Sequence, residues 1–365
     1  MPRHKKYLQK EKHESLKKIL HFVLENKKTT RREIEKQTGY SWSTISSSIT
    51  LLLDKKILIE SDPVVSGVGR STSYLTPNGE HFVAIGVDVN SVGYSTSIIG
   101  IDGRNYHHFN LPFDSDKQMD IILRLYECLN NAIALIDKEK EIYSIGVSFQ
   151  GKPSPNEDIA SFPFSSDWKS INIKNIIEEK YNIFTHVDHD VTCLLRDYLY
   201  QKDKKDVTSL ALLRFVAGIG CVIYTRNNIL NDNLPINVGQ WIINPELGKD
   251  GTFEYMASTL GIEKQTKVTF DKVNINRDAY EKTFSQVAKY IGLTLTYIRD
   301  GYLFCDNGQI KYVLTGPVID NDEKLLDKIK ESYNNFSRHE ETTIFEVNST
   351  LSASRGAAIL SYLLK

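Results

Sequence analysis

The sequence predicts an α/β protein that begins with a mostly helical segment of the winged helix-turn-helix class. Up to about residue 53, apolar residues recur at helical spacing and are interrupted by a glycine turn. From residue 80, apolar strands alternate with amphipathic helices. Positive charge is also concentrated early: residues 1–80 hold 15 Lys and Arg against 9 Asp and Glu, whereas the remainder holds 30 against 37. Only the N-terminal part is therefore expected to be drawn to phosphate.

Residues 13–78 are expected to form three helices and a two-stranded wing, after a basic tail over residues 1–12. The first helix spans residues 13–25 and has one apolar face, made of Leu16, Ile19, Leu20 and Val23. Thr30 and Glu33 have the spacing of a capping box, so a second helix is expected to follow Thr30 directly.

The third helix has the properties of a recognition helix. Gly39 ends the second helix in a tight turn, and Ser41 can cap the third. Its inner face is the apolar stripe of Ile45, Ile49, Leu52 and Leu53. Its outer face carries Trp42, Ser43, Thr44, Ser46, Ser47 and Thr50. This face is small and hydroxylated and carries no acid before Asp54, which suits docking in a major groove.

A wing is predicted to follow the third helix. Residues 57–60 form its first strand, and a loop with Gly67, Gly69 and Arg70 leads to a return strand from Tyr74. We therefore expect double-stranded DNA as a partner, with Arg31 and Arg32 on phosphates and Arg70 in a minor groove. Trp42, Ser43, Thr44 and Ser47 are expected to face base edges, and Ser41 and Ser46 are further candidate DNA-binding residues. The alternative is a helical hairpin that packs against another part of the chain.

A turn at residues 77–79 marks the expected domain boundary, and an α/β body with a mixed sheet follows it. Strands are predicted at 81–89, 94–102, 105–113, 141–149, 182–190, two within 207–230, 311–319 and 340–349. Helices are predicted at 119–137, 171–181, 191–201, within 279–304, at 323–332 and at 353–364. The stretch from residue 207 begins with a strand, a glycine turn and a strand, as the body itself does, which favours a duplicated unit.

Composition excludes several classes of protein. No apolar run approaches the roughly 18 residues of a membrane span, and the charged N-terminus is not a secretory signal. The four cysteines are far apart in the sequence, which argues against a disulfide framework or a zinc site: Cys128, Cys193, Cys221 and Cys305. A reducing cytoplasm is the expected location, and each cysteine is expected to be a small buried residue.

In order and spacing, the segments resemble the repressor branch of the ROK family of repressors, open reading frames and sugar kinases. The resemblance runs from about residue 13 to the C-terminus and includes the winged helix. Its motifs are GVGR followed by YLTPN, then AIGVDV, SIGVSFQGKPSP, DWKSINIKNIIEEKYNIFTHVDHD, Gly218-Ile219-Gly220 and GTFEYMAS. It implies an actin-like body of two lobes, residues 79–195 and 196–365, with a sugar cleft between them and the last helix free to pack back on the first lobe.

Measured against this family, the parts that hold phosphate are altered. A kinase of the family needs glycine loops whose N–H groups approach phosphate oxygens. The first loop here reads Asp88-Val89-Asn90-Ser91-Val92-Gly93, the second Val216-Ala217-Gly218-Ile219-Gly220 and the third Thr315-Gly316-Pro317. Each has lost glycines, and the alternative for the second is an ordinary tight strand turn. No catalytic role is expected, although Asp190 aligns with the family's base; its other interpretation is a helix N-cap.

The sugar and zinc contacts of the family also differ. Phe164 and Asn237 stand where the family has a sugar-contacting Asn and Glu, whereas Glu254 is retained. Gln240 replaces a histidine zinc ligand, and the cysteine run is missing from residues 248–252, so no metal or other cofactor is expected. His186 and His189 are three residues apart but lie on an expected strand-to-loop turn, so they are not expected to bind a metal. The candidate effector-binding residues are Phe164, His189, Asp190, Asn237, Gln240 and Glu254.

The sequence therefore predicts a DNA-binding regulator, a homodimer or homotetramer, that represses sugar-utilisation genes and responds to a sugar or sugar-derived effector. Two alternatives stay open. One is an ATP-dependent sugar kinase with a regulatory DNA-binding head. The other is a regulator without a small-molecule effector.

Overall fold

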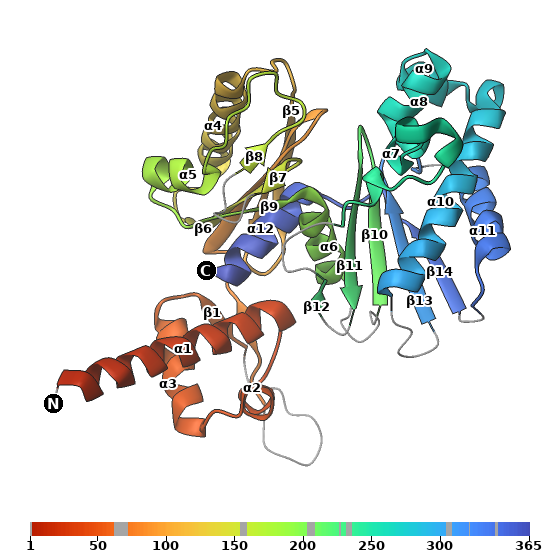
Figure 1. Cartoon of the computed structure of the whole chain (residues 1–365). Helices are drawn as coiled ribbons and strands as arrows, with labels where there is room; N and C mark the ends of the chain where they lie inside the picture. Colours follow the sequence, from red (N-terminus) through yellow and green to blue (C-terminus); the bar gives the residue numbers. More distant parts are fainter. Residues whose placement is uncertain are drawn as a thin grey trace. The chain divides into compact units, whose positions relative to one another are not determined.

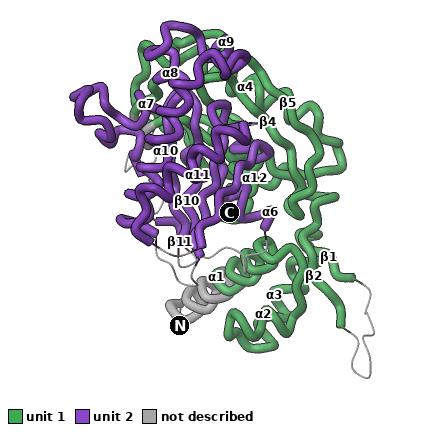
Figure 2. The backbone as a smooth tube through the Cα atoms, turned by 90° about the vertical axis from the view of Figure 1, so that its right-hand side faces the viewer, with its two compact units in different colours: residues 1–188, 354–365 green, residues 189–353 purple. Residues whose placement is uncertain are grey.

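The structure is a computed structural model. It describes residues 2–61, 72–153, 159–202, 209–225, 228–230, 236–303, 309–320, 322–339 and 342–365. The chain divides into two compact units, residues 1–188 with 354–365 and residues 189–353 (Figure 2). Each unit contains a five-stranded sheet, and an N-terminal helical segment precedes the first sheet (Figure 1). The predicted fold class, a helical head followed by an α/β body, is confirmed.

The head consists of three helices and a two-stranded sheet (Figure 1). Its elements are α1 (Pro2–Asn26), α2 (Arg31–Thr38), α3 (Trp42–Asp54), β1 (Leu58–Glu60) and β2 (Leu75–Pro77). The predicted capping box is present: Thr30 N donates to Glu33 Oε2 at 2.8 Å, and Glu33 N donates to Thr30 Oγ1 at 3.2 Å. Gly39 ends α2 with a φ of 70°, a conformation that a side chain disfavours. The buried core of the head is Ile19, Val23, Ile34, Ile45, Ile49, Leu52, Leu58 and Leu75.

Two expectations for the head need comment. Residues 2–12, expected to belong to a basic tail, are helical backbone, since α1 begins at Pro2. Lysine, leucine, glutamine and glutamate, which make up much of this stretch, are good helix formers, which explains why the helix extends that far. The tip of the expected wing, residues 62–71 with Gly67, Gly69 and Arg70, lies outside the described residues.

The sheet of the first unit has the strand order β5-β4-β3-β6-β9. The strands are β3 (Phe82–Val89), β4 (Gly93–Gly100), β5 (Asn105–Pro112), β6 (Glu141–Phe149) and β9 (Thr185–His189). The helices are α4 (Gln118–Leu135), α5 (Ile173–Tyr181) and α12 (Ala353–Leu364), and two short strands, β7 (Lys152–Pro153) and β8 (Ile159–Ser161), pair with each other. Large apolar residues of β3 and β6 pack with α4 and α5: Val83, Ile85, Val87, Val89, Ile145, Val147 and Phe149.

The opposite face of this sheet accepts α12 at close range. A Cβ on Gly86 would lie 1.8 Å from the carbonyl oxygen of Ser354, and one on Gly146 would lie 2.0 Å from that of Ala357. The Oγ atoms of Ser144 and Ser361 are 2.8 Å apart. The alternation of large and small residues in the two strands therefore lets helices cover both faces of the sheet.

The second unit repeats this topology with the order β12-β11-β10-β13-β14, which confirms the predicted duplication of the body at the level of strand order. Its strands are β10 (Ser209–Phe215), β11 (Ile219–Thr225), β12 (Asn228–Ile229), β13 (Gln309–Thr315) and β14 (Thr342–Val347). α6 (Asp190–Gln201) contacts β10 and β11. The other helices include α7 (Phe253–Ala257), α8 (Thr259–Thr266), α9 (Phe270–Ile275), α10 (Glu281–Tyr302) and α11 (Glu323–Phe336).

No helix in the described part of the chain is long and apolar enough to span a bilayer.

Candidate functional site

The outer face of α3 is exposed as predicted for a recognition helix. Trp42 is 49% exposed, and Ser41, Ser43 and Ser47 are also exposed, whereas Thr44 and Ser46 are half-buried. Ser48, which lies between these residues and the apolar stripe, is buried. The Ser41 hydroxyl accepts a hydrogen bond from Thr44 N at 3.3 Å and so caps the helix. The N-terminal turn of α3 therefore presents an indole ring and several hydroxyls to the solvent.

The two arginines of α2 have different surroundings. Arg31 forms a bidentate ion pair with Glu60 of β1, in which its Nη2 donates to Oε2 at 2.9 Å. This pair holds the pKa of Glu60 below its ordinary value and ties α2 to the wing sheet. Arg32 is exposed and lines an open cavity of about 480 Å³ together with Trp42. The phosphate contact expected of Arg31 thus competes with an internal ion pair, whereas Arg32 faces solvent.

In the second unit, Asp190 lies at the start of α6 and is paired with two basic residues. Its Oδ2 accepts from Nη1 of Arg214 at 2.7 Å, and its Oδ1 lies 2.7 Å from Nδ1 of His189. Burial alone would raise the pKa of this carboxyl, but His189 and Arg214 outweigh burial and hold the pKa well below its ordinary range. A carboxylate with such a depressed pKa is a weak proton acceptor.

The interpretation of Asp190 as a helix N-cap needs correction. α6 begins at Asp190 itself and His189 is the N-cap residue, without a side-chain capping bond. Asp190 Oδ1 accepts from the N–H of Val191 at 2.8 Å, so the carboxylate still satisfies one unpaired donor of the first turn. The reason is that β9 runs directly into α6, so the capping position falls on His189, the last residue of the strand.

Arg214 is a site residue that the sequence analysis missed. It lies on β10, directly before the second glycine turn, and its side chain is 16% exposed. Its charge also acts on Asp320, whose carboxylate accepts from Gly316 N at 3.2 Å in the third turn, and burial raises the pKa of Asp320. An arginine within an apolar strand is costly to bury without an acidic partner. The position of Arg214 in such a strand was therefore the one feature of the sequence that indicated an ion pair.

Glu254 of α7 lies against the second glycine turn. The N–H of Ile219 donates to Glu254 Oε2 at 3.4 Å, and a Cβ on Gly218 would lie 2.8 Å from the same oxygen. A Cβ on Gly239 would lie 3.1 Å from it. Burial raises the pKa of Glu254. The turn thus carries a carboxylate of the chain itself on one of its N–H groups, which disfavours a phosphate in that place.

In the first unit, Asn90 closes the β3–β4 turn. Its Oδ1 accepts from Val92 N at 2.8 Å and from Gly93 N at 3.3 Å. Its Nδ2 donates to Asp88 Oδ2 at 2.7 Å, and the hydroxyl of Ser148 donates to the other oxygen of Asp88 at 2.5 Å. The backbone donors that a phosphate needs are already bonded to an amide oxygen.

The remaining candidate effector residues are dispersed. Phe164 belongs to the first unit and packs edge-on against Phe162, 5.3 Å between ring centroids. Asn237 precedes a short 3-10 turn of the second unit, Val238–Gln240, and Gln240 is its last residue; both side chains are exposed. Within that unit the structure brings this turn next to Glu254, because Gly239 contacts the Glu254 side chain.

Residues 241–252 correspond to the loop in which the family carries zinc ligands. Backbone hydrogen bonds and aromatic packing hold this loop here. The backbone N–H groups of Ile243 and Asn244 both donate to the carbonyl of Gly251, at 2.9 and 3.0 Å. Trp241 stacks on Tyr302 with 6.2 Å between centroids. Among the described residues, no group of three or more His, Cys, Asp and Glu could hold a metal ion.

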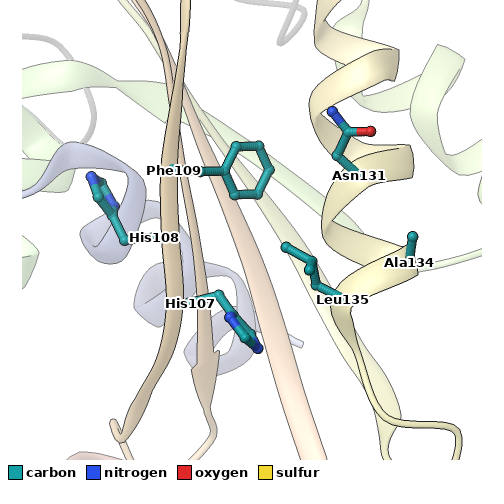
Figure 3. A pocket seen from close by; sticks show the side chains of 6 residues that line it. All are labelled: His107, His108, Phe109, Asn131, Ala134 and Leu135. Atoms are coloured by element: carbon teal, nitrogen blue, oxygen red, sulfur yellow. The ribbon is translucent and has the colours of Figure 1, made fainter.

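A separate cavity of about 410 Å³ lies beside the edge strand β5 in the first unit (Figure 3). Phe109 of β5 points toward Asn131 and Leu135 of α4, whereas His108 points to the opposite side of its strand (Figure 3). His108 Nδ1 lies 3.1 Å from the Ser97 hydroxyl. The cavity contains no candidate effector residue and no Asp, Glu, Lys or Arg, so it does not correspond to the predicted sugar site.

The comparison with family models decides the classification. The model described as the ROK family matches residues 123–362, more than half of the chain. The chain belongs to the ROK family. The match starts in α4 and extends into α12, so it covers most of the α/β body.

Individual members of the ROK family extend the similarity to the head. The xylose repressor of Bacillus spizizenii is 22% identical over 335 residues, which cover 86% of this chain and 85% of that protein. A crystal structure of a ROK family transcriptional regulator, described as a homologue of the E. coli MLC protein, aligns with a TM-score of 0.77 at 16% identity, over 92% of this chain and 93% of that one. A ROK glucokinase from Streptomyces griseus, in complex with glucose and AMPPNP, aligns with a TM-score of 0.64 at 14% identity, over 76% of this chain and 98% of its own.

Proposed function

We propose that this ROK protein is a DNA-binding transcriptional regulator that represses sugar-related genes. One observation carries the proposal: a capped helix-turn-helix with an exposed, uncharged outer face precedes the kinase-like body. The alignments agree with it. The solved regulator covers 92% of the chain, whereas the glucokinase covers 76% although 98% of its own length is matched. The additional segment is where a regulator of this family differs in fold from a kinase.

DNA recognition follows from the geometry of the head. The N-terminal turn of α3 enters a major groove, so that Trp42, Ser43 and Thr44 lie near base edges. Arg32 and the neighbouring lysines hold the phosphates. Two heads of a homodimer would bind half-sites about one helical turn apart. Selection of bound fragments from a genomic DNA library, followed by sequencing, tests this function. Recovery of a recurring inverted repeat supports it, and recovery of unrelated fragments at random contradicts it.

The body is proposed not to transfer phosphate. In the first two turns that the resemblance assigns to phosphate, Asn90 and Glu254 occupy backbone N–H groups, and in the third Asp320 does so. Asp190, which aligns with the base, is held ionised by Arg214 and His189.

An assay of ATP-dependent phosphorylation over a panel of hexoses, pentoses and amino sugars separates a regulator from a sugar kinase. We expect no turnover by the wild-type protein above that of Asp190→Asn. Turnover that the substitution abolishes would favour the kinase alternative, which the glucokinase-like fold of the body keeps open.

We propose a sugar or sugar-derived molecule as the effector of the body, in keeping with the name of the xylose repressor that it resembles. If DNA changes the affinity of the protein for a ligand by some factor, the ligand must change the affinity of the protein for DNA by the same factor. Titration of the selected duplex in the presence of each sugar measures that factor. If no sugar shifts either DNA affinity or thermal stability, the regulator without an effector is the correct alternative.

A further inference from the structure

The recognition helix α3 lacks the side chains that usually recognise bases by bidentate hydrogen bonds. Guanine is commonly read by Arg or Lys, and adenine by Asn or Gln. α3 (Trp42–Asp54) contains none of these four residue types, and its only charged residue is Asp54 in its last turn. Sequence discrimination by α3 therefore needs a different chemical contact.

The hydroxyl groups of α3 are partly engaged within the helix. The Ser41 hydroxyl lies 2.9 Å from that of Ser43 and 2.9 Å from that of Thr44. The Ser47 hydroxyl donates to the carbonyl of Thr44 at 3.0 Å. A base edge must compete with these bonds, so hydroxyl contacts alone give little discrimination between bases.

Trp42 is one of two large apolar residues of α3 that are exposed, the other being Leu51, which is 41% exposed near the opposite end of the helix. Trp42 is the first residue of α3, the position from which a recognition helix contacts base edges, and it is 49% exposed. It also lines the cavity of about 480 Å³ whose other walls are the residues Thr30, Arg31, Arg32, Glu35, Thr72 and Ser73. Two arginines, a glutamate and several hydroxyls therefore surround an apolar ring, which suits a polar partner that carries one apolar group.

In the major groove of DNA, that apolar group is the 5-methyl of thymine. We infer that Trp42 reads thymine by van der Waals contact with this methyl group, and that its contact position in each half-site is a thymine. The inference rests on the proposed DNA-binding function and adds to it the base that α3 selects and the residue that selects it.

The test replaces single thymines of the selected duplex, one at a time, by deoxyuridine. This removes the methyl group and leaves Watson–Crick pairing and charge unchanged. For the wild-type protein, we expect one replacement in each half-site to weaken binding about fourfold, the loss of one buried methyl-sized group. Replacements elsewhere should leave the affinity unchanged.

Two substitutions of Trp42 test whether this residue makes the contact with the methyl group. Trp42→Phe keeps an aromatic ring, and we expect it to retain a preference for thymine over uracil at that position. Trp42→Ala removes the ring, and its ratio of affinities for the two duplexes should fall to about one. Because the side chain is half-exposed, both variants should keep the wild-type thermal midpoint, which is the control for folding.

The possible results distinguish failure of this inference from failure of the proposed function. Equal wild-type affinities for all thymine and uracil duplexes overturn the inference and leave the DNA-binding function standing. A thymine preference that survives in Trp42→Ala also overturns it, because another residue then makes the contact. A wild-type protein that prefers no duplex at all rejects the proposed function, and the inference with it.

Discussion

Ion pairs between charged side chains join separate elements of this chain. Asp190 of α6 and Arg214 of β10 are 24 residues apart and form one such pair, in which the Asp190 carboxylate is buried. Arg31 of α2 and Glu60 of β1 form another, which joins α2 to the wing sheet. The contribution of each pair can be measured by replacing one of its partners.

Replacement of Asp190 by Asn tests whether its ion pairs stabilise the second unit. Removal of this buried charge leaves Arg214 without its carboxylate, so we expect a loss of about 3 kcal/mol in the free energy of unfolding at pH 7. The folded-state pKa of Asp190 lies below the unfolded value of about 3.9. Its stabilisation is therefore complete above that value and is lost as the pH falls toward the folded-state pKa.

Urea unfolding of the wild type and of Asp190→Asn at pH 7 and pH 3 measures this loss, and the difference should shrink at the lower pH. Asp278→Asn is the matched control, because Asp278 is 92% exposed and pairs with an exposed lysine. A control variant as destabilised as Asp190→Asn would show that the buried ion pairs stabilise the protein no more than an exposed pair does.

The adjacent arginines of α2 should differ in their contribution to DNA binding. The dependence of log affinity on log salt concentration reports phosphate contacts, at about 0.9 per contact. We expect Arg32→Ala to reduce this slope by about that amount, because Arg32 faces solvent. Arg31→Ala should leave the slope unchanged, since Arg31 is paired with Glu60. Equal reductions in both variants would show that DNA breaks the Arg31–Glu60 pair.

At the scale of elements, hydrophobic periodicity predicted the longer helices and the strands of both five-stranded sheets except the two-residue β12. The predicted helix over residues 353–364 coincides with α12, because its apolar pattern spans several turns. The helices α7, α8 and α9 were not predicted. They have five, eight and six residues, too few to display a helical period.

The contact between α12 and its sheet should tolerate no side chain at Gly146. A Cβ there would lie 2.0 Å from the carbonyl oxygen of Ala357, so Gly146→Ala must displace α12. We expect a loss of about 1–3 kcal/mol in stability, measured as a lower thermal midpoint.

Gly301 provides the matched control for this substitution. It lies in α10, and an added Cβ would meet nothing within 4 Å. Gly301→Ala should therefore leave the thermal midpoint unchanged or raise it, since alanine favours a helix. A Gly146→Ala variant as stable as the wild type would refute the close packing of α12.

At the scale of the whole molecule, charge and topology carry the functional assignment. The excess of positive charge in the first 80 residues indicates the part that we propose faces DNA, and the overall net charge of −1 conceals it. The repeated strand order of the two sheets agrees with the duplication predicted from the strand, glycine turn and strand that begin each half of the body. The pairing of Glu254 with the second glycine turn could not be predicted, because Glu254 is 35 residues from Ile219 and reaches the turn through the fold of its unit. Asn90 and Asp320 bond N–H groups only two and four residues away, so their pairing is local.

The proposed function requires above all that the head distinguishes one DNA sequence from others. A competition titration at physiological salt measures this, with the selected duplex against a scrambled duplex of equal length and composition. We expect the protein to prefer the selected duplex by at least about 1,000-fold. Equal affinities for the two duplexes would show that the head does not recognise sequence.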